Sequence, residues 1–368
     1  MIYFLGRYLY SNFEIFSFLR LADYISARAI GAALTAITLT LYLTPVIIRS
    51  LHGRGLVDQQ RSTGVASAFD KAGTPAMGGA IVAGCVIVSC LLWCNLSNLF
   101  LAVVLLGMAW FGVIGFLDDL AKAREQSGDK GMSESKKLFL QALFAAALTA
   151  LMVGPWSPLP AAQAGAFYIP FVKHPIFQSL WIYAPIIFFF IIVVGNSVNI
   201  ADGMDGLAIV PSVFVIGVLG LFGYFLGNAI YSNYLNYPFL PGAGELAVFA
   251  SAFTGAGIGF LWFNAYPAQI FMGDTGSMAI GGAAAAACVV LQQEALFLIL
   301  GGMFLAEAAT SQIQDKIGIR WIGRRIFIRA PMHHRMQHKG LAETKVVIRL
   351  WIISGILALA ALATLKLR

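Results

Sequence analysis

The chain has 368 residues, of which 59% are apolar and 11% are charged, and its formal net charge is +7. A soluble domain averages about 45–50% apolar and about 25% charged residues, so this composition excludes a water-soluble fold of this length. The basic excess does not indicate nucleic-acid binding, because membrane proteins collect Lys and Arg in their cytoplasmic loops. We therefore expect an all-α polytopic membrane protein with a single integral-membrane domain over residues 1–368.

Ten apolar segments are candidates to cross a bilayer, for which a helix needs about 20 residues. They are 27–48, 77–95, 98–117, 138–154, 180–199, 207–226, 246–263, 276–292, 295–315 and 346–365. Helices are expected because a lipid-exposed backbone must satisfy its polar groups within its own segment. The first 28 residues show no cleavable signal peptide.

Two features are predicted to have structural roles only. The four cysteines (Cys85, Cys90, Cys94 and Cys288) fall in apolar segments without metal-ligand spacing, so they are expected to pack as small apolar side chains. The stretch 155–178 contains five prolines and predicts a short surface element, with a hairpin around Ala166 to Val172.

The placement of basic residues predicts the orientation in the membrane. If the N-terminus lies outside, the inner loops are 49–76, 118–137, 200–206, 264–275 and 316–345. These inner loops hold 17 Lys and Arg residues, whereas the outer segments hold 6. The positive-inside rule then places both termini outside, which is the periplasm if the source is a Gram-negative bacterium.

Acidic residues gather at the same inner face. Five of them stand close to the ends of predicted spans: Asp118 and Asp119, Asp202 and Asp205, and Asp274. One such pair could be a solvated helix end, but three groups on one face predict a site, because carboxylates at a membrane boundary need solvent, a partner or a cation. Carboxylate oxygens are typical Mg²⁺ ligands. The chain has no Cys/His cluster for zinc and no P-loop motif.

Basic and histidine side chains complete this inner face. They are Lys71, Lys122, Lys130, Lys137, His333 and His334. Cation-binding acids beside groups that can meet phosphate oxygens describe a phosphoryl-transfer site. Each also has a plainer interpretation: the lysines could be membrane anchors, the histidines ordinary surface residues, and Asn264 a helix cap. Their coincidence on one face favours function.

Five motifs in this order resemble the polyprenyl-phosphate N-acetylhexosamine-1-phosphate transferases over essentially the whole chain. They are Lys71–Gly79 (KAGTPAMGG), Gly115–Asp119 (GFLDD), Asn199–Leu207 (NIADGMDGL), Asn264–Ser277 (NAYPAQIFMGDTGS) and Ala330–His334 (APMHH). The last motif is similar to the muramoyl branch of that family.

This resemblance implies ten transmembrane helices and a cytoplasmic active site in the bacterial inner membrane. It implies that UDP-MurNAc-pentapeptide and the membrane lipid undecaprenyl phosphate give lipid I and UMP, with Mg²⁺ as cofactor, in peptidoglycan synthesis. It also implies a homodimer.

The resemblance assigns roles to individual residues. Asp274 would be the main Mg²⁺ ligand, Asp118 a base on the lipid phosphate or a nucleophile, and Asp119 its support. His333 and His334 would also be catalytic. Substrate-binding residues would be Lys71, Lys122, Lys130, Asn196, Asn199, Asp202, Asp205, Asn264 and Phe271, with Phe271 as a stacking surface for uracil. Lys137 could take the role of Lys130.

One position departs from the family pattern, which has three consecutive histidines where this chain has His333-His334-Arg335. Arginine keeps a donor for phosphate but cannot act as a base near neutral pH. Gln337 also replaces a glutamate, and His338 lies nearby.

Two other functions remain open. A sister enzyme that transfers GlcNAc-1-phosphate to the same lipid would share the acidic motifs. A transporter could also use acids in the membrane, but transporter sites usually lie near the midplane, where Glu307 is the only acid well within a segment.

Overall fold

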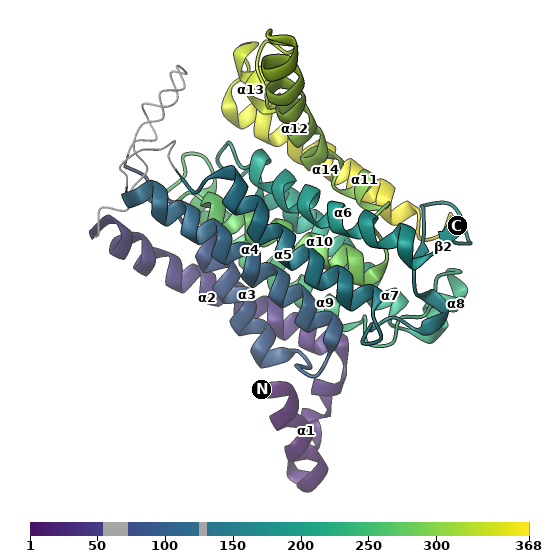
Figure 1. Ribbon diagram of the computed structural model, residues 1–368. Helices are drawn as coiled ribbons and strands as arrows, with labels where there is room; N and C mark the ends of the chain where they lie inside the picture. Colours follow the sequence, from purple (N-terminus) through teal and green to yellow (C-terminus); the bar gives the residue numbers. More distant parts are fainter. Residues whose placement is uncertain (54–72, 125–130, 368) are drawn as a thin grey trace.

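Long apolar runs fold as long helices in this chain, since only bonds within a segment satisfy a backbone in lipid. The computed structural model describes residues 1–53, 73–124 and 131–367, and eight of its helices are long and apolar enough to cross a membrane. They are α2 (Ile25–Gly53), α4 (Leu99–Arg124), α5 (Glu134–Val153), α6 (Leu180–Ala201), α7 (Ile209–Leu226), α9 (Glu245–Asn264), α10 (Gly273–Leu291) and α14 (Glu343–Ala363). The predicted all-α, multi-pass membrane fold is confirmed (Figure 1).

The other two predicted segments are helical but less regular. Segment 77–95 forms α3 (Gly79–Trp93), an apolar helix of 15 residues. Segment 295–315 is divided at Gly301 into α11 (Phe297–Leu300) and α12 (Gly302–Gln312), and the chain continues as the π-helical η4 (Ile313–Ile322). All ten predicted segments are therefore helical, and eight of them meet the length of a full span.

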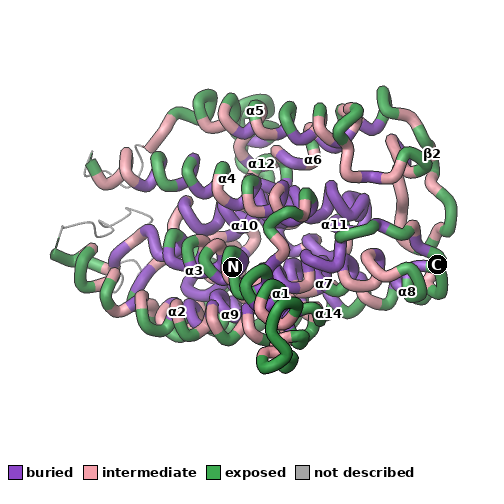
Figure 2. The backbone as a smooth tube through the Cα atoms, turned by 90° about the horizontal axis from the view of Figure 1, so that it is seen from below, coloured by how far each residue is buried: buried purple, intermediate pink, exposed green. Residues whose placement is uncertain are grey.

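Helix α10 lies at the centre of the bundle, and every residue from Thr275 to Leu291 is buried (Figure 2). Glycines bring its neighbours to backbone contact. A Cβ on Gly115 of α4 would lie 2.1 Å from the Asp274 carbonyl oxygen, and one on Gly79 of α3 would lie 2.0 Å from the Cα of Gly276. Small residues allow such close approach between membrane helices. The end of α4 is thus held against the first turn of α10.

The remaining elements lie at the two ends of this bundle. The N-terminal α1 (Ile2–Asn12) and η1 (Glu14–Asp23) lie below it in Figure 1. The predicted hairpin is confirmed as β1 (Ala166–Phe167) paired antiparallel with β2 (Phe177–Gln178), after the short η3 (Ala161–Gln163). Two further short helices are α8 (Ala229–Tyr234) and α13 (Met332–His338).

A buried ion pair joins the first long helix to α9 at the end opposite α13. Both guanidinium Nη atoms of Arg28 lie 2.7 Å from the two carboxylate oxygens of Glu245, and the side chains are 4% and 9% exposed. The Asn95 N–H also donates to Glu245 at 2.9 Å. All four cysteines are free and buried, which confirms the apolar role expected of them.

Candidate active site

Three aspartates meet where α4 ends and α10 begins. Asp118 and Asp119 lie in the last two turns of α4, and Asp274 lies in the first turn of α10. One carboxylate oxygen from each lies within 4.8 Å of the other two. Asp118 is fully buried, and the side chain of Asp274 is 19% exposed. We refer to this group as the acidic cluster, and to its side of the bundle as the acidic end.

Two lysines bridge Asp118 and Asp274. The Nζ atoms of Lys122 and Lys137 lie 3.0 and 2.9 Å from Oδ2 of Asp274, to which both donate hydrogen bonds. Each Nζ is also 2.8 Å from Oδ2 of Asp118 as an ion-pair contact. The other oxygen of Asp118 accepts the Met132 N–H at 2.6 Å. Asp118 therefore has both oxygens occupied by cationic or N–H groups.

Asp119 serves as a cap for α10. Its carboxylate accepts the Asp274 N–H at 3.1 Å, the Thr275 N–H at 2.9 Å and the Thr275 hydroxyl at 2.7 Å. The first N–H groups of a helix have no partner within it, and an acidic group there also meets the positive end of the helix dipole. Gly273 precedes with φ of +73°, and a Cβ there would lie 2.7 Å from Asp119 Oδ2. The cap thus fixes the turn that presents Asp274.

The other sequence-predicted polar residues line the ends of α6 and α9. Asn199 donates to the Ser277 hydroxyl at 3.0 Å, which ties the end of α6 to the first turn of α10. Asn264 accepts the Gly206 N–H at 3.0 Å and donates to the Ile270 carbonyl at 2.9 Å. Asp205 accepts the Ala268 N–H at 3.1 Å. These contacts hold the Asp202–Gly206 turn and the loop before α10 against each other, with Asp202 partly exposed between them.

Asn196 lies one turn deeper in α6. Its side chain donates to Gln141 Oε1 of α5 at 2.7 Å and accepts from Gln141 Nε2 at 3.1 Å. This reciprocal amide pair joins α5 to α6 beside the acidic end. Gln141 was not expected from the sequence, since a lone Gln in an apolar helix has no motif to mark it.

The histidines lie on α13, beside the turn after α6. His333 is 1% exposed, and its Nδ1 lies 3.1 Å from Oε2 of Glu307 in α12. A Cβ built on Gly203 would lie 2.3 Å from His333 Nε2. His334 packs against His333 with ring centroids 4.4 Å apart, and burial together with His333 lowers the pKa of His334 below its ordinary value of 6.5. In the sequence Glu307 is an isolated acid within an apolar segment, whereas the structure pairs it with His333.

Three further predicted residues are Lys71, Lys130 and Phe271. Lys71 and Lys130 lie outside the described residues. Phe271 is partly buried, and its backbone bonds with Pro75 and Gly78 hold the start of α3 next to α10. Lys137, which the sequence offered only as a substitute for Lys130, is the lysine of α5 in contact with both acids.

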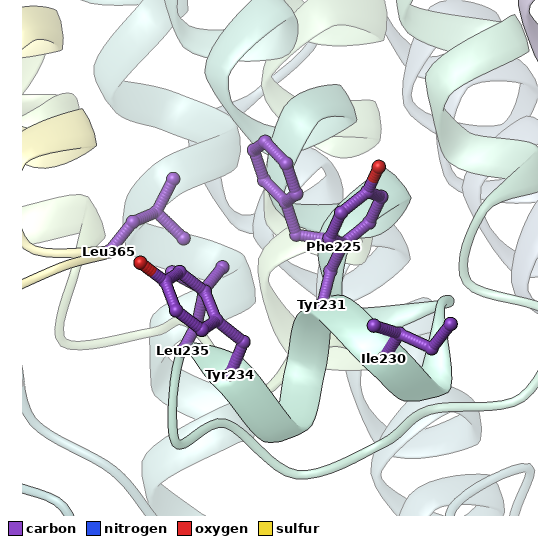
Figure 3. A pocket seen from close by; sticks show the side chains of 6 residues that line it. All are labelled: Phe225, Ile230, Tyr231, Tyr234, Leu235 and Leu365. Carbon is purple, nitrogen blue, oxygen red and sulfur yellow. The ribbon is translucent and has the colours of Figure 1, made fainter.

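An apolar pocket lies at the end opposite the acidic cluster. It is lined by Phe225, Ile230, Tyr231, Tyr234, Leu235 and Leu365 (Figure 3). These side chains come from the end of α7, from α8 and the residue after it, and from the segment after α14. The pocket has no acidic lining residue, so the chemistry belongs to the acidic end.

The acidic cluster fits a hard divalent cation. Three carboxylates against two ammonium groups leave one excess negative charge, and carboxylate oxygens are the donors that Mg²⁺ prefers. Asp274 is the most exposed of the three acids, so it is the one that an incoming cation and its bound phosphates would meet first. The two lysines add positive charge for phosphate oxygens at the same point.

A comparison with known protein families finds a match over half of the chain. The family described as "Glycosyl transferase family 4" matches residues 101–292, which is 192 of the 368 residues. The matched region runs from α4 to the end of α10. It contains the acidic cluster, both lysines, the Asp202–Gly206 turn and Asn264.

Proposed function

Because the chain belongs to glycosyl transferase family 4, and so transfers a sugar 1-phosphate to a polyprenyl phosphate, we propose that its sugar is phospho-MurNAc-pentapeptide. The donor would be UDP-MurNAc-pentapeptide and the acceptor undecaprenyl phosphate, giving lipid I and UMP. The motif at Ala330–His334, which is similar to the muramoyl branch, supports this choice of donor. The proposed protein is thus a phospho-N-acetylmuramoyl-pentapeptide transferase.

The observation that carries the proposed phosphoryl-transfer chemistry is the bridge of Lys122 and Lys137 across Asp118 and Asp274. Transfer of a phosphoryl group needs positioning and neutralised charge more than covalent chemistry. Mg²⁺ held by Asp274, with Asp118 and Asp119 beside it, would neutralise charge on the donor's pyrophosphate. The lysines would hold phosphate oxygens of donor and acceptor in line, so that an acceptor oxygen attacks the β-phosphorus and UMP leaves.

In this mechanism Asp118 positions the two lysines and is not a nucleophile. The side chain is fully buried, and its oxygens are already bound by Lys122, Lys137 and the Met132 N–H. An acceptor phosphate with a second pKa of about 6 needs little help to lose its proton near neutral pH. We expect no phospho-sugar adduct on Asp118 in intact-mass spectra of the enzyme quenched during turnover, and such an adduct would refute direct attack.

The identity of the sugar is tested by a membrane assay with undecaprenyl phosphate as acceptor. UDP-MurNAc-pentapeptide and UDP-GlcNAc are supplied separately, each with Mg²⁺ and with excess chelator. We expect Mg²⁺-dependent release of UMP from the muramoyl donor alone. Turnover with UDP-GlcNAc alone would assign the chain to the sister reaction. Uptake or efflux of solutes without UMP release would contradict the transferase assignment.

We also propose that the acidic end faces the cytoplasm, as the excess of Lys and Arg in the loops on that side indicates. The native cysteines are buried, so single introduced cysteines can report the orientation. Arg320→Cys near the acidic end should be labelled only after a membrane-impermeant maleimide reaches the cytoplasm. Lys173→Cys, exposed in the segment after β1, should be labelled in intact spheroplasts. The reverse pattern would invert the topology.

A further inference from the structure

A buried carboxylate on α12 contacts His333 through two different groups of that residue. Glu307 is fully buried, and both of its oxygens accept the His333 backbone N–H, at 3.1 and 3.3 Å. Its Oε2 also lies 3.1 Å from Nδ1 of the imidazole. Two points of contact on one side chain fix both the start of α13 and the orientation of the ring.

This contact determines where the imidazole carries its proton. A carboxylate only accepts hydrogen bonds, so the nitrogen facing it must be the N–H donor. In neutral imidazole the proton is then on Nδ1, and Nε2 carries a lone pair. The same arrangement orients metal-bound and catalytic histidines, where a carboxylate holds the tautomer.

The free nitrogen faces the Asp202–Gly206 turn. Nε2 is buried and has no hydrogen-bond partner among the residues that the structure describes. Gly203 lies against it, and a Cβ at that position would meet Nε2 at 2.3 Å and Cε1 at 2.9 Å. A buried acceptor without a donor is costly, which indicates that a ligand completes it. The glycine at residue 203, which is exposed, lets the turn lie directly against this nitrogen.

The turn itself belongs to the same end as the acidic cluster. Asn199 lies one turn before Gly203 and bonds to Ser277, which follows Asp274 by three residues on α10. A donor substrate bound at the acidic cluster would therefore lie beside His333. The hydroxyl and imide N–H groups of this substrate can donate hydrogen bonds to Nε2. Its phosphate oxygens only accept hydrogen bonds, so they cannot bond to an unprotonated nitrogen.

We propose that Glu307 is a positioning residue that holds His333 as the Nδ1–H tautomer, so that Nε2 accepts a hydrogen bond from a hydroxyl or N–H group of the nucleotide-sugar. The inference rests on the proposed function for its ligand. It changes the role expected of His333, which the sequence had suggested as a partner of phosphate oxygens. His333 would bind a hydroxyl or N–H group of the nucleotide-sugar, and the lysines would bind its phosphate oxygens.

The tautomer can be measured without any substrate. The chain has five histidines, so ¹⁵N-histidine labelling of the full-length protein in nanodiscs gives few signals, and His333→Asn identifies those of His333. At pH 8 we expect a protonated Nδ1 and an unprotonated Nε2, with this preference lost in Glu307→Gln. A proton on Nε2, or on both nitrogens, in the wild-type protein would overturn the proposal. This measurement tests the role of Glu307 whichever sugar the enzyme transfers.

Kinetics separate positioning from a merely structural role. Glu307→Gln should lower kcat/KM for the nucleotide-sugar by about 10–100-fold, as loss of orienting partners does elsewhere, with the KM for polyprenyl phosphate unchanged. Gly203→Ala should give a similar loss, because the added methyl would lie 2.3 Å from Nε2 and would force the turn and the ring apart. The backbone of Gly203 lies outside the left-handed region, so alanine adds no backbone strain and acts only through its contact with the ring.

The matched control is Glu294→Gln, which alters another buried glutamate, between α10 and α11 at the end opposite the acidic cluster. We expect it to retain wild-type kcat/KM. Equal losses in Glu307→Gln and Glu294→Gln would show a general effect on folding and would refute the positioning role. Wild-type kcat/KM in either Glu307→Gln or Gly203→Ala would also contradict the proposal.

Discussion

Replacing Asp274 with asparagine should separate cation binding from folding. The substitution keeps the shape of the side chain and removes one negative charge from the acidic cluster. Each lysine would still lie 2.8 Å from Oδ2 of Asp118, and Asp119 would still accept the backbone N–H groups of residues 274 and 275. We therefore expect Asp274→Asn to fold and to melt close to the wild-type Tm.

The loss of Mg²⁺ affinity can be worked from the charges. A unit charge and a divalent cation about 4 Å apart interact by about 8 kcal/mol at an effective dielectric constant of about 20. If water ligands recover half of that, the remaining 4 kcal/mol or so weakens Mg²⁺ binding by about a thousandfold. The cluster would also become neutral, with two carboxylates facing two ammonium groups.

The assay is a Mg²⁺ titration of UMP release in detergent or nanodiscs, with thermal unfolding of the same preparations. Asp315→Asn, at a half-exposed surface carboxylate paired with Arg320, is the control for loss of a negative charge. It should leave the titration unchanged. If Asp274→Asn kept near-normal turnover at the wild-type Mg²⁺ concentration, the assignment of Asp274 as the main ligand would be wrong.

Three further predictions concern the lysine bridge, the buried ion pair and a buried acid. Lys137→Met should lower kcat by about 100-fold, as loss of one preorganised donor to developing charge does, whereas Lys136→Met, at an exposed neighbour, should leave kcat unchanged. Glu245→Gln should destabilise the fold by about 3–5 kcal/mol because it leaves the buried Arg28 charge without its partner. The drop in Tm measures this loss. The double variant Arg28→Met, Glu245→Met should recover most of the lost stability. Burial raises the pKa of Glu294 from 4.5 to about 8 despite a hydrogen bond from Tyr183, so the folded chain holds a proton that the unfolded chain releases. Stability should then fall by about 1.4 kcal/mol per pH unit as pH rises from about 4.5 to about 8. Glu294→Gln should lack this component in thermal melts, and an unchanged pH profile would show that Glu294 is ionised when folded.

The gathering of the three aspartates at one end could be predicted because helix ends are visible in an apolar sequence. Asp118, Asp119 and Asp274 each stand at a boundary between an apolar run and a polar loop, and alternation of the spans places those boundaries at one end. The contact between them was not predictable in detail. The contact depends on pairs of glycines on neighbouring helices, such as Gly79 with Gly276. The spacing of glycines along one helix does not show which glycine of another helix each of them contacts.

Side-chain roles within the site were harder to predict, because residue type does not show which group a polar side chain bonds to. Asn264 and Asn196 stand in or beside family motifs, yet both bond to the protein itself, to backbone groups and to Gln141. Lys130, Lys136 and Lys137 look equivalent in sequence, whereas the phase of α5 turns Lys137 to the acids and Lys136 outward. Glu307 and His333 lie 26 residues apart, and only the fold after α12 brings them together.

The central position of α10 has a consequence for motion during turnover. Amide exchange is slowest where a helix is shielded on all sides, and α10 is buried at every residue from Thr275 to Leu291. Asp274 lies in the first turn of this helix, and Asp119 accepts its backbone N–H, so we expect Asp274 to keep its position during turnover. The groups expected to move during a catalytic cycle are then the two lysine side chains and the short helix α13. Hydrogen-exchange mass spectrometry should find α10 among the last helices to exchange, with and without substrate.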